Sequence, residues 1–150
     1  MRSAAPAGPF EAPELGRIPM TDIGNLIARI CLGVVFLWSG FTKWRDPVGG
    51  LSEVTALGLP VPSAFLIATI VCQLAGAFMI LLGIWTRLGA LMLLGFTVVA
   101  TLMAHRFSGL SRAARQERLT TSLEHLAIVG GFLLLLIHGA GAFSLDAVMG

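Results

Sequence analysis

Four long apolar stretches, separated by short polar connections, occupy most of this chain. They are residues 23–41, 64–84, 88–103 and 123–140. Each is close to the ~20 residues that an α-helix needs to cross a hydrocarbon core about 30 Å thick. Inside lipid the backbone N–H and C=O groups must find partners within the protein, and an α-helix supplies them locally. The pattern therefore predicts an all-α integral membrane protein, a four-helix bundle with spans at these positions.

The first twenty residues differ from the rest of the chain. Residues 1–20 hold four prolines and two glutamates and contain no long apolar run. Proline and glycine interrupt a helical period, and a secretory signal would need an apolar core of about 7–15 residues. We expect a disordered N-terminal tail over 1–20 and a single membrane domain over 21–150.

The composition narrows the class of protein further. Hydrophobic residues make up 56% of the chain and charged residues 12%, with a mean hydropathy of +0.88. Soluble domains carry about 25% charged residues, so a soluble bundle of this composition could not solvate its surface. The formal net charge of +2 is too small to indicate nucleic-acid binding. The expected partner is the lipid bilayer, and a homo-oligomer stays open.

Basic residues are distributed unevenly between the two sides of the predicted bundle. The connections after the first and third spans share one side and hold Lys43, Arg45, Arg106, Arg112, Arg115 and Arg118. The other side holds Arg2, Arg17 and Arg87. Because cytoplasmic loops carry the excess of Lys and Arg, this pattern predicts that both termini lie on the non-cytoplasmic side.

Ionisable side chains inside lipid are costly, which makes them candidates for function. Four gather on the side of the termini: Arg29, Arg87, His138 and Asp146. Two arginines and a histidine at one level could receive an anion or a quinone head group. Two structural roles are alternatives: Arg29 can extend to the nearer lipid head groups, and an Arg87–Asp146 ion pair can tie the second hairpin to the C-terminal end.

A second group of polar side chains lies on the opposite side, namely Lys43, His105, Glu124 and His125. Adjacent residues of a helix point about 100° apart, so Glu124 and His125 cannot face the same spot. We expect Glu124 to face the bundle and to pair with His105 or Lys43. A protonated Glu124 is the alternative, because desolvation favours the neutral acid.

The remaining polar features carry weaker signals. Gln73 lies in the middle of the second span, where a hydrogen bond to another helix is its expected role. The three histidines lack HExxH spacing and an acidic cluster, so no metal site is predicted; a haem on His105 and His125 is disfavoured. The basic residues 111–118 can lie along anionic head groups, at about 1 kcal/mol each, or form a solvated loop.

Several short motifs, in order, resemble the DoxX family of small membrane proteins. The run ARICLGVVF followed by SGFTK is similar to the family's first helix, and GLP precedes the second span. QLAG and LGIWTR resemble the second helix and its hairpin, and Glu124 and SLD complete the pattern over about residues 24–148. Many members carry Glu where this chain has Gln73. A proton-carrying role at this position is therefore not implied, whereas a hydrogen-bonding role is.

The resemblance implies a four-helix protein of the bacterial inner membrane and suggests its function. Some DoxX-like proteins are small subunits of thiosulfate:quinone oxidoreductases, and others belong to membrane complexes concerned with oxidative or thiol stress. We therefore expect a subunit of such an assembly, with a soluble redox partner, a quinone as ligand and no covalently bound cofactor. The alternative is a non-catalytic scaffold that docks a soluble partner through residues 105–122. The candidate site residues are Arg29, Lys43, Gln73, Arg87, His105, Glu124, His138 and Asp146.

Overall fold

The computed structural model describes residues 20–104 and 111–149, and every regular element in these ranges is a helix. The helices are α1 (Met20–Arg45), α2 (Pro47–Ala56), α3 (Pro62–Leu82), α4 (Thr86–Ala104), α5 (Arg112–His138) and α6 (Leu145–Met149). Four of them, α1, α3, α4 and α5, are long and apolar enough to cross a membrane. The all-α membrane bundle is therefore confirmed. The expected tail falls outside the described residues, except that Met20 begins α1.

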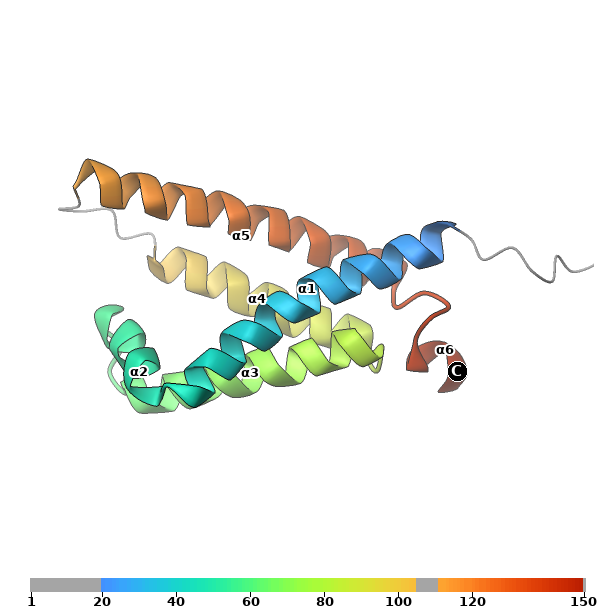
Figure 1. Cartoon of the computed structure of the whole chain (residues 1–150), viewed down its shortest axis with the longest axis horizontal. Coiled ribbons are helices and arrows are strands. Elements are labelled where there is room, and N and C mark those ends of the chain that lie inside the picture. The colour runs from blue at the N-terminus through green and yellow to red at the C-terminus, as the bar shows by residue number, and fades with distance from the viewer. Residues whose placement is uncertain (1–19, 105–110, 150) are drawn as a thin grey trace, which may run out of the picture.

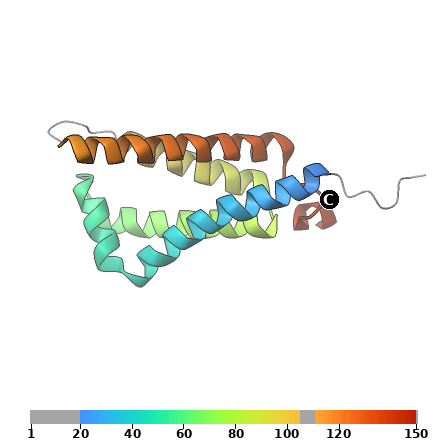
Figure 2. The same cartoon turned by 45° about the horizontal axis from the view of Figure 1, so that its top comes forward.

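The helices form two pairs that share a common core. α1 packs along α3, α3 along α4, and α4 along α5, while α1 and α5 meet over a shorter length (Figures 1 and 2). The buried apolar side chains at the centre are Phe36, Ala77, Ile80, Ala90, Leu93, Phe132 and Leu135. The short helix α2 folds back against α3 at one end of the bundle, and α6 lies at the other end (Figure 1).

Glycines let the central helices approach closely. A Cβ added at Gly33 of α1 would lie 2.6 Å from the Leu81 side chain, and one at Gly76 of α3 would lie 2.7 Å from that of Leu93. Lipid tails are as apolar as leucine, so helix association in a membrane depends on such close packing. These contacts bring α1, α3 and α4 together and fix the polar side chains that lie between them.

The largest difference from the sequence-based boundaries is in α5. This helix begins at Arg112 instead of at residue 123, and the Ser111 hydroxyl caps it by accepting from the Ala114 N–H at 3.3 Å. The basic segment is therefore helical, and the expectation of a solvated loop is wrong for residues 112–118. At 1.5 Å per residue, the 27 residues of α5 span about 40 Å, longer than a hydrocarbon core of about 30 Å. Because its first turns carry Arg112, Arg115 and Arg118, which are costly inside lipid, we expect those turns to extend beyond the hydrocarbon core.

Candidate functional site

Arg29 is enclosed by backbone carbonyls at the end of the bundle that carries α6. Its Nε donates to Ile80 O at 2.8 Å and its Nη2 to Leu81 O at 3.0 Å, both near the C-terminal end of α3. Its Nη1 donates to Ala140 O at 3.0 Å and Phe143 O at 2.6 Å, in the segment after α5. The last carbonyls of a helix lack partners within the helix and favour a nearby positive charge. Arg29 therefore fastens α3 and the segment after α5 to α1.

This arrangement decides between the alternatives for Arg29. The residue is 1% exposed, so its side chain does not extend to the lipid head groups. A guanidinium has five N–H groups, and four hydrogen bonds to carbonyls already engage Arg29. Its positive charge alone suggested that Arg29 binds an anion. The four carbonyls around its guanidinium favour a structural role instead.

Asp146 ties the C-terminal end to the turn between α3 and α4, although not through the expected partner. Its carboxylate accepts from the backbone N–H groups of Trp85 at 2.7 Å and Thr86 at 3.0 Å, and its own N–H donates to Gly83 O at 2.7 Å. Within the described residues no ion pair joins it to Arg87. The prediction of that ion pair is wrong, because the N–H groups at the start of α4 hold the carboxylate instead.

Arg87 and His138, the other candidates at this end, face outward. Arg87 is exposed and borders an open depression that Asp146 and Gly139 also line. His138 is exposed, and its Nδ1 lies 3.0 Å from Leu134 O in the preceding turn of the same helix. The structure therefore does not bring the four candidates of this side into one enclosed site.

The surroundings of Asp146 predict a stability that depends on pH. Burial by itself would raise the pKa of Asp146, but the N–H groups of Thr86 and Trp85, with a contribution from the Arg29 charge, hold this pKa below its ordinary value of 3.8. A carboxylate with a lowered pKa stabilises the fold above its unfolded pKa, and this contribution disappears as the pH falls through the folded pKa. We expect Asp146→Asn to lower the melting temperature by a few degrees at pH 7 and to have little effect at a pH below the folded pKa.

Thermal unfolding in detergent at several pH values measures this effect. Glu124→Gln, which neutralises an exposed carboxylate elsewhere, is the matched control and should leave the curve unchanged. A loss of stability in Asp146→Asn that is the same at every pH would contradict the electrostatic explanation.

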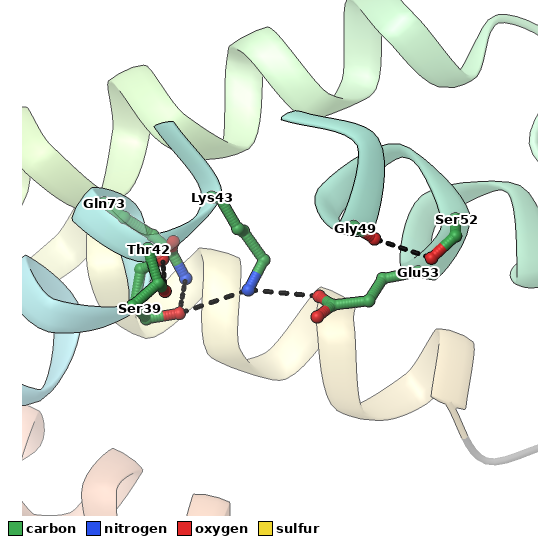
Figure 3. Close-up of polar contacts among 7 residues, drawn as sticks. All are labelled: Ser39, Thr42, Lys43, Gly49, Ser52, Glu53 and Gln73. Atoms are coloured by element: carbon green, nitrogen blue, oxygen red, sulfur yellow. Dashed lines mark hydrogen bonds and ion pairs between the residues drawn. The ribbon is translucent and has the colours of Figure 1, made fainter. Parts of the chain in front are cut away.

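A chain of polar contacts lies at the opposite end, between α1, α2 and α3 (Figure 3). Gln73 of α3 donates from Nε2 to Ser39 Oγ of α1 at 3.2 Å, the interhelical bond expected from the sequence. Lys43 Nζ lies 3.4 Å from the same hydroxyl and forms an ion pair with Glu53 of α2 at 3.1 Å. The partner of Lys43 is thus Glu53 and not Glu124. This chain of contacts leads from the buried amide to a largely exposed carboxylate.

The prediction that Glu124 faces the bundle is wrong. Glu124 is exposed on the outer face of α5, whereas His125 is half-buried and its Nδ1 lies 2.7 Å from Thr101 Oγ1 of α4. His105, the other expected partner, lies outside the described residues. The buried face of α5 continues from His125 through Ile128 to Phe132. The helical phase therefore turns the histidine inward and the glutamate outward.

Ser39, Gln73 and His125 converge on a small internal pocket of about 100 Å³. The pocket lies between α1, α3, α4 and α5, and its lining residues are Val35, Phe36, Ser39, Gln73, Phe96, Thr97, Ala100, His125 and Ile128. Gln73 is 4% exposed, and its Oε1 is buried without a hydrogen-bond partner. A buried acceptor without a partner is costly and unusual in native proteins. The pocket is therefore suited to a ligand that donates a hydrogen bond and has an apolar body.

Relatives of this chain are found among known proteins. The DoxX family model matches residues 24–106. The inner membrane protein YqjF of Escherichia coli (strain K12) is 34% identical over 130 residues, which cover 87% of this chain and 95% of the relative. The inner membrane protein YphA of the same organism is 32% identical over 121 residues, with coverages of 81% and 86%.

The name of a third relative includes an enzyme class. The protein "Putative oxidoreductase CatD" of Bacillus subtilis (strain 168) is 32% identical over 119 residues, which cover 77% of this chain and 85% of the relative. No solved structure matches the chain. The similarity to these three relatives therefore extends over most of the four-helix bundle.

Proposed function

Because this chain belongs to the DoxX family, we propose that it is an inner-membrane subunit of a quinone-linked oxidoreductase or thiol-stress complex and that it binds the quinone. Two relatives are named as inner membrane proteins, which supports this location. A third is named as an oxidoreductase, which supports redox chemistry. The sequence offers no redox cofactor site of its own, so the electrons come from a partner that oxidises a sulfur compound or a thiol.

The observation that carries the proposal is the buried, unpartnered amide oxygen of Gln73, whose side chain lines a pocket of mixed polar and apolar residues at membrane depth. A quinol is dissolved in the lipid, has an aromatic ring, and donates hydrogen bonds from its hydroxyl groups. Gln73 Oε1 would accept from one hydroxyl, and Phe36 and Phe96 would pack against the ring. Lys43 and Ser39 keep the amide of Gln73 oriented through the chain of contacts in Figure 3.

The size of the pocket sets how the ligand lies. At about 100 Å³ it is smaller than the 300–1,000 Å³ that enclose a whole ligand. The pocket therefore receives one edge of the ring and its hydroxyl, and the isoprenoid tail lies in the lipid beside the exposed faces of the helices. This arrangement requires no water-filled entrance, because the ligand arrives through the bilayer.

Direct binding tests the proposal. The protein in lipid nanodiscs is titrated with decylubiquinol and decylubiquinone, and saturable binding of the quinol is expected. Quinone reduction with thiosulfate is then measured, alone and with the products of neighbouring genes, and activity is expected only with a partner. Failure to bind either form of the quinone would remove the proposal.

The charge distribution supports an orientation for this subunit. The ends that carry Lys43 and the basic turns of α5 face the cytoplasm, and α6 faces the other side. Alkaline phosphatase fused after residue 150 should then be active in intact cells. A fluorescent protein fused at the same position should be dark, and the opposite result would reverse the orientation.

The projecting turns of α5 favour a second function, the docking of a soluble partner. Arg112, Arg115 and Arg118 lie on a helical segment whose residues are largely exposed. Replacing all three with Gln should abolish a complex that forms through this segment and leave the bundle folded. An unchanged pull-down with the folded variant would count against docking at this position.

A further inference from the structure

His125 of α5 lines two spaces of the bundle. One is the small internal pocket that Gln73 also lines. The other is a hollow of about 330 Å³ between α4 and the first turns of α5, lined by Thr101, Glu117, Arg118, Thr121, Ser122 and His125 among others. His125 lines both spaces, and Glu117, Arg118 and Thr121 of the hollow are exposed. His125 therefore borders both the buried pocket and the hollow.

The hydrogen bonds around Thr101 define the tautomer of His125. Thr101 Oγ1 lies 2.7 Å from Thr97 O and 2.7 Å from His125 Nδ1. A hydroxyl has one proton, and the Thr97 carbonyl can only accept, so the proton of Thr101 points to that carbonyl. Nδ1 of His125 must then donate to Thr101 Oγ1. In the neutral ring this leaves Nε2 with a free lone pair that can accept a proton.

The other walls of the pocket offer no alternative proton carrier. Of the described residues that line it, His125 is the one with an acid–base side chain. α3 contributes the amide of Gln73, α4 the hydroxyl of Thr97, and α1 the hydroxyl of Ser39, with Lys43 behind it. On its own helix, the adjacent Glu124 is exposed and lines neither space, while Glu117 and Arg118 line the hollow and not the pocket. Protons can therefore pass between these two spaces at the imidazole.

We infer that His125 exchanges a proton between a quinone head group in the pocket and the hollow at the surface, an assignment that rests on the proposed function. The step moves one proton and no electron. In the direction of reduction, the Nε2–H bond of the charged imidazole breaks, an O–H bond forms on the reduced head group, and the N–H electron pair stays on Nε2. The two electrons come from the sulfur or thiol donor of the partner. Water from the hollow then returns a proton to Nε2, the ring nitrogen left without a hydrogen, and a second transfer of the same kind supplies the second proton that the two-electron reduction to a quinol requires.

Calorimetric titration of decylubiquinol into nanodiscs tests this assignment without turnover. Titrations in buffers of different ionisation enthalpy count the protons exchanged on binding, and they are repeated between about pH 5 and 8, where histidine changes charge. Gln73 Oε1 accepts the one proton of the quinol hydroxyl, so the hydroxyl oxygen can accept from charged Nε2–H but meets only a lone pair on neutral Nε2, and wild-type affinity should rise about tenfold as the pH decreases. His125→Gln keeps a donor, and we expect it to bind within about threefold of wild type at low pH and to lose the pH dependence. These fold-changes correspond to about 1.4 kcal/mol per factor of ten.

The matched control is His138→Gln, which removes an exposed histidine of the same helix and should keep the wild-type pH profile. If no protein binds the quinol, the proposed function fails. If wild type and His125→Gln bind with the same pH dependence and proton count, the proton-exchange assignment fails and the binding function stands. If His125→Gln does not fold, Thr101→Val decides: it removes the partner of Nδ1 and should shift the midpoint of the pH profile, and an unshifted midpoint would overturn the assignment.

Discussion

Replacing Arg29 with Met should lower the free energy of unfolding by at least about 3 kcal/mol, because four backbone carbonyls lose their charged donor. Each hydrogen bond to a charged group contributes about 1.5–3 kcal/mol, and a buried carbonyl left without a donor adds a desolvation cost. Neither lipid nor the neighbouring apolar side chains can replace the guanidinium. For a chain of this size the midpoint of thermal unfolding in detergent should fall by more than about 6 °C.

The matched control for this prediction is Arg87→Met, which makes the same chemical change at an exposed arginine and should leave the midpoint nearly unchanged. Arg29→Lys should recover only part of the loss, because a compact ammonium cannot reach carbonyls of α3 and of the segment after α5 in the same geometry. If Arg29→Met unfolded at the wild-type temperature and failed to bind a quinol, the structural role would be wrong and the ligand role would be favoured.

Replacing Gln73 with Met should weaken quinol binding without a comparable loss of stability. The variant loses the acceptor Oε1 in the pocket, so the affinity for decylubiquinol should fall at least about tenfold. Stability should stay within about 1 kcal/mol of wild type or increase, because the change removes a buried polar atom that has no partner. The lost hydrogen bond from Nε2 to Ser39 offsets part of this gain. Calorimetric titration measures the first effect and thermal unfolding the second.

A conservative variant distinguishes the contribution of the hydrogen-bond acceptor to quinol binding from that of side-chain packing in the pocket. Gln73→Glu retains an oxygen acceptor and gives up the donor to Ser39, so it should bind the quinol better than Gln73→Met does. Gln116→Met makes the same chemical change at an exposed position of α5 and should affect neither property. Equal affinities for wild type and Gln73→Met would show that the pocket is not the binding site.

The sequence predicted where the polar residues lie along the membrane normal, but it did not predict which of them meet. Glu124 and His125 illustrate this limit. In a soluble protein a polar outer face reveals which side of a helix is buried, whereas in lipid the outer face of α5 is as apolar as its inner face. The sequence then does not show which face of the helix is buried, and charge alone favoured Glu124 over His125. The stripe His125, Ile128 and Phe132 was present in the sequence, but nothing marked it as the buried one.

Arg87 and Asp146 show a second limit. Opposite charges at one membrane level suggest an ion pair. The side-chain pattern does not reveal that backbone N–H groups at the start of α4 compete for the carboxylate. Those groups hold the Asp146 carboxylate at 2.7 and 3.0 Å. In the same way, the carbonyls that surround Arg29 belong to two segments that are far from it in the sequence. Every residue has a backbone carbonyl, so the sequence does not show which of them will accept from Arg29.

Hydrophobic length and composition determined that this chain forms four membrane-spanning helices, since in lipid an α-helix satisfies its own backbone groups whatever its neighbours are. The interhelical role of Gln73 also followed from its depth in the second span. Only the tertiary structure decided that Gln73, Ser39 and His125 share a pocket and that Arg29 and Asp146 bind backbone groups. The reason is that each of these contacts depends on how one helix is rotated about its axis relative to another. Close glycine contacts, such as that of Gly33 with Leu81, fix this rotation.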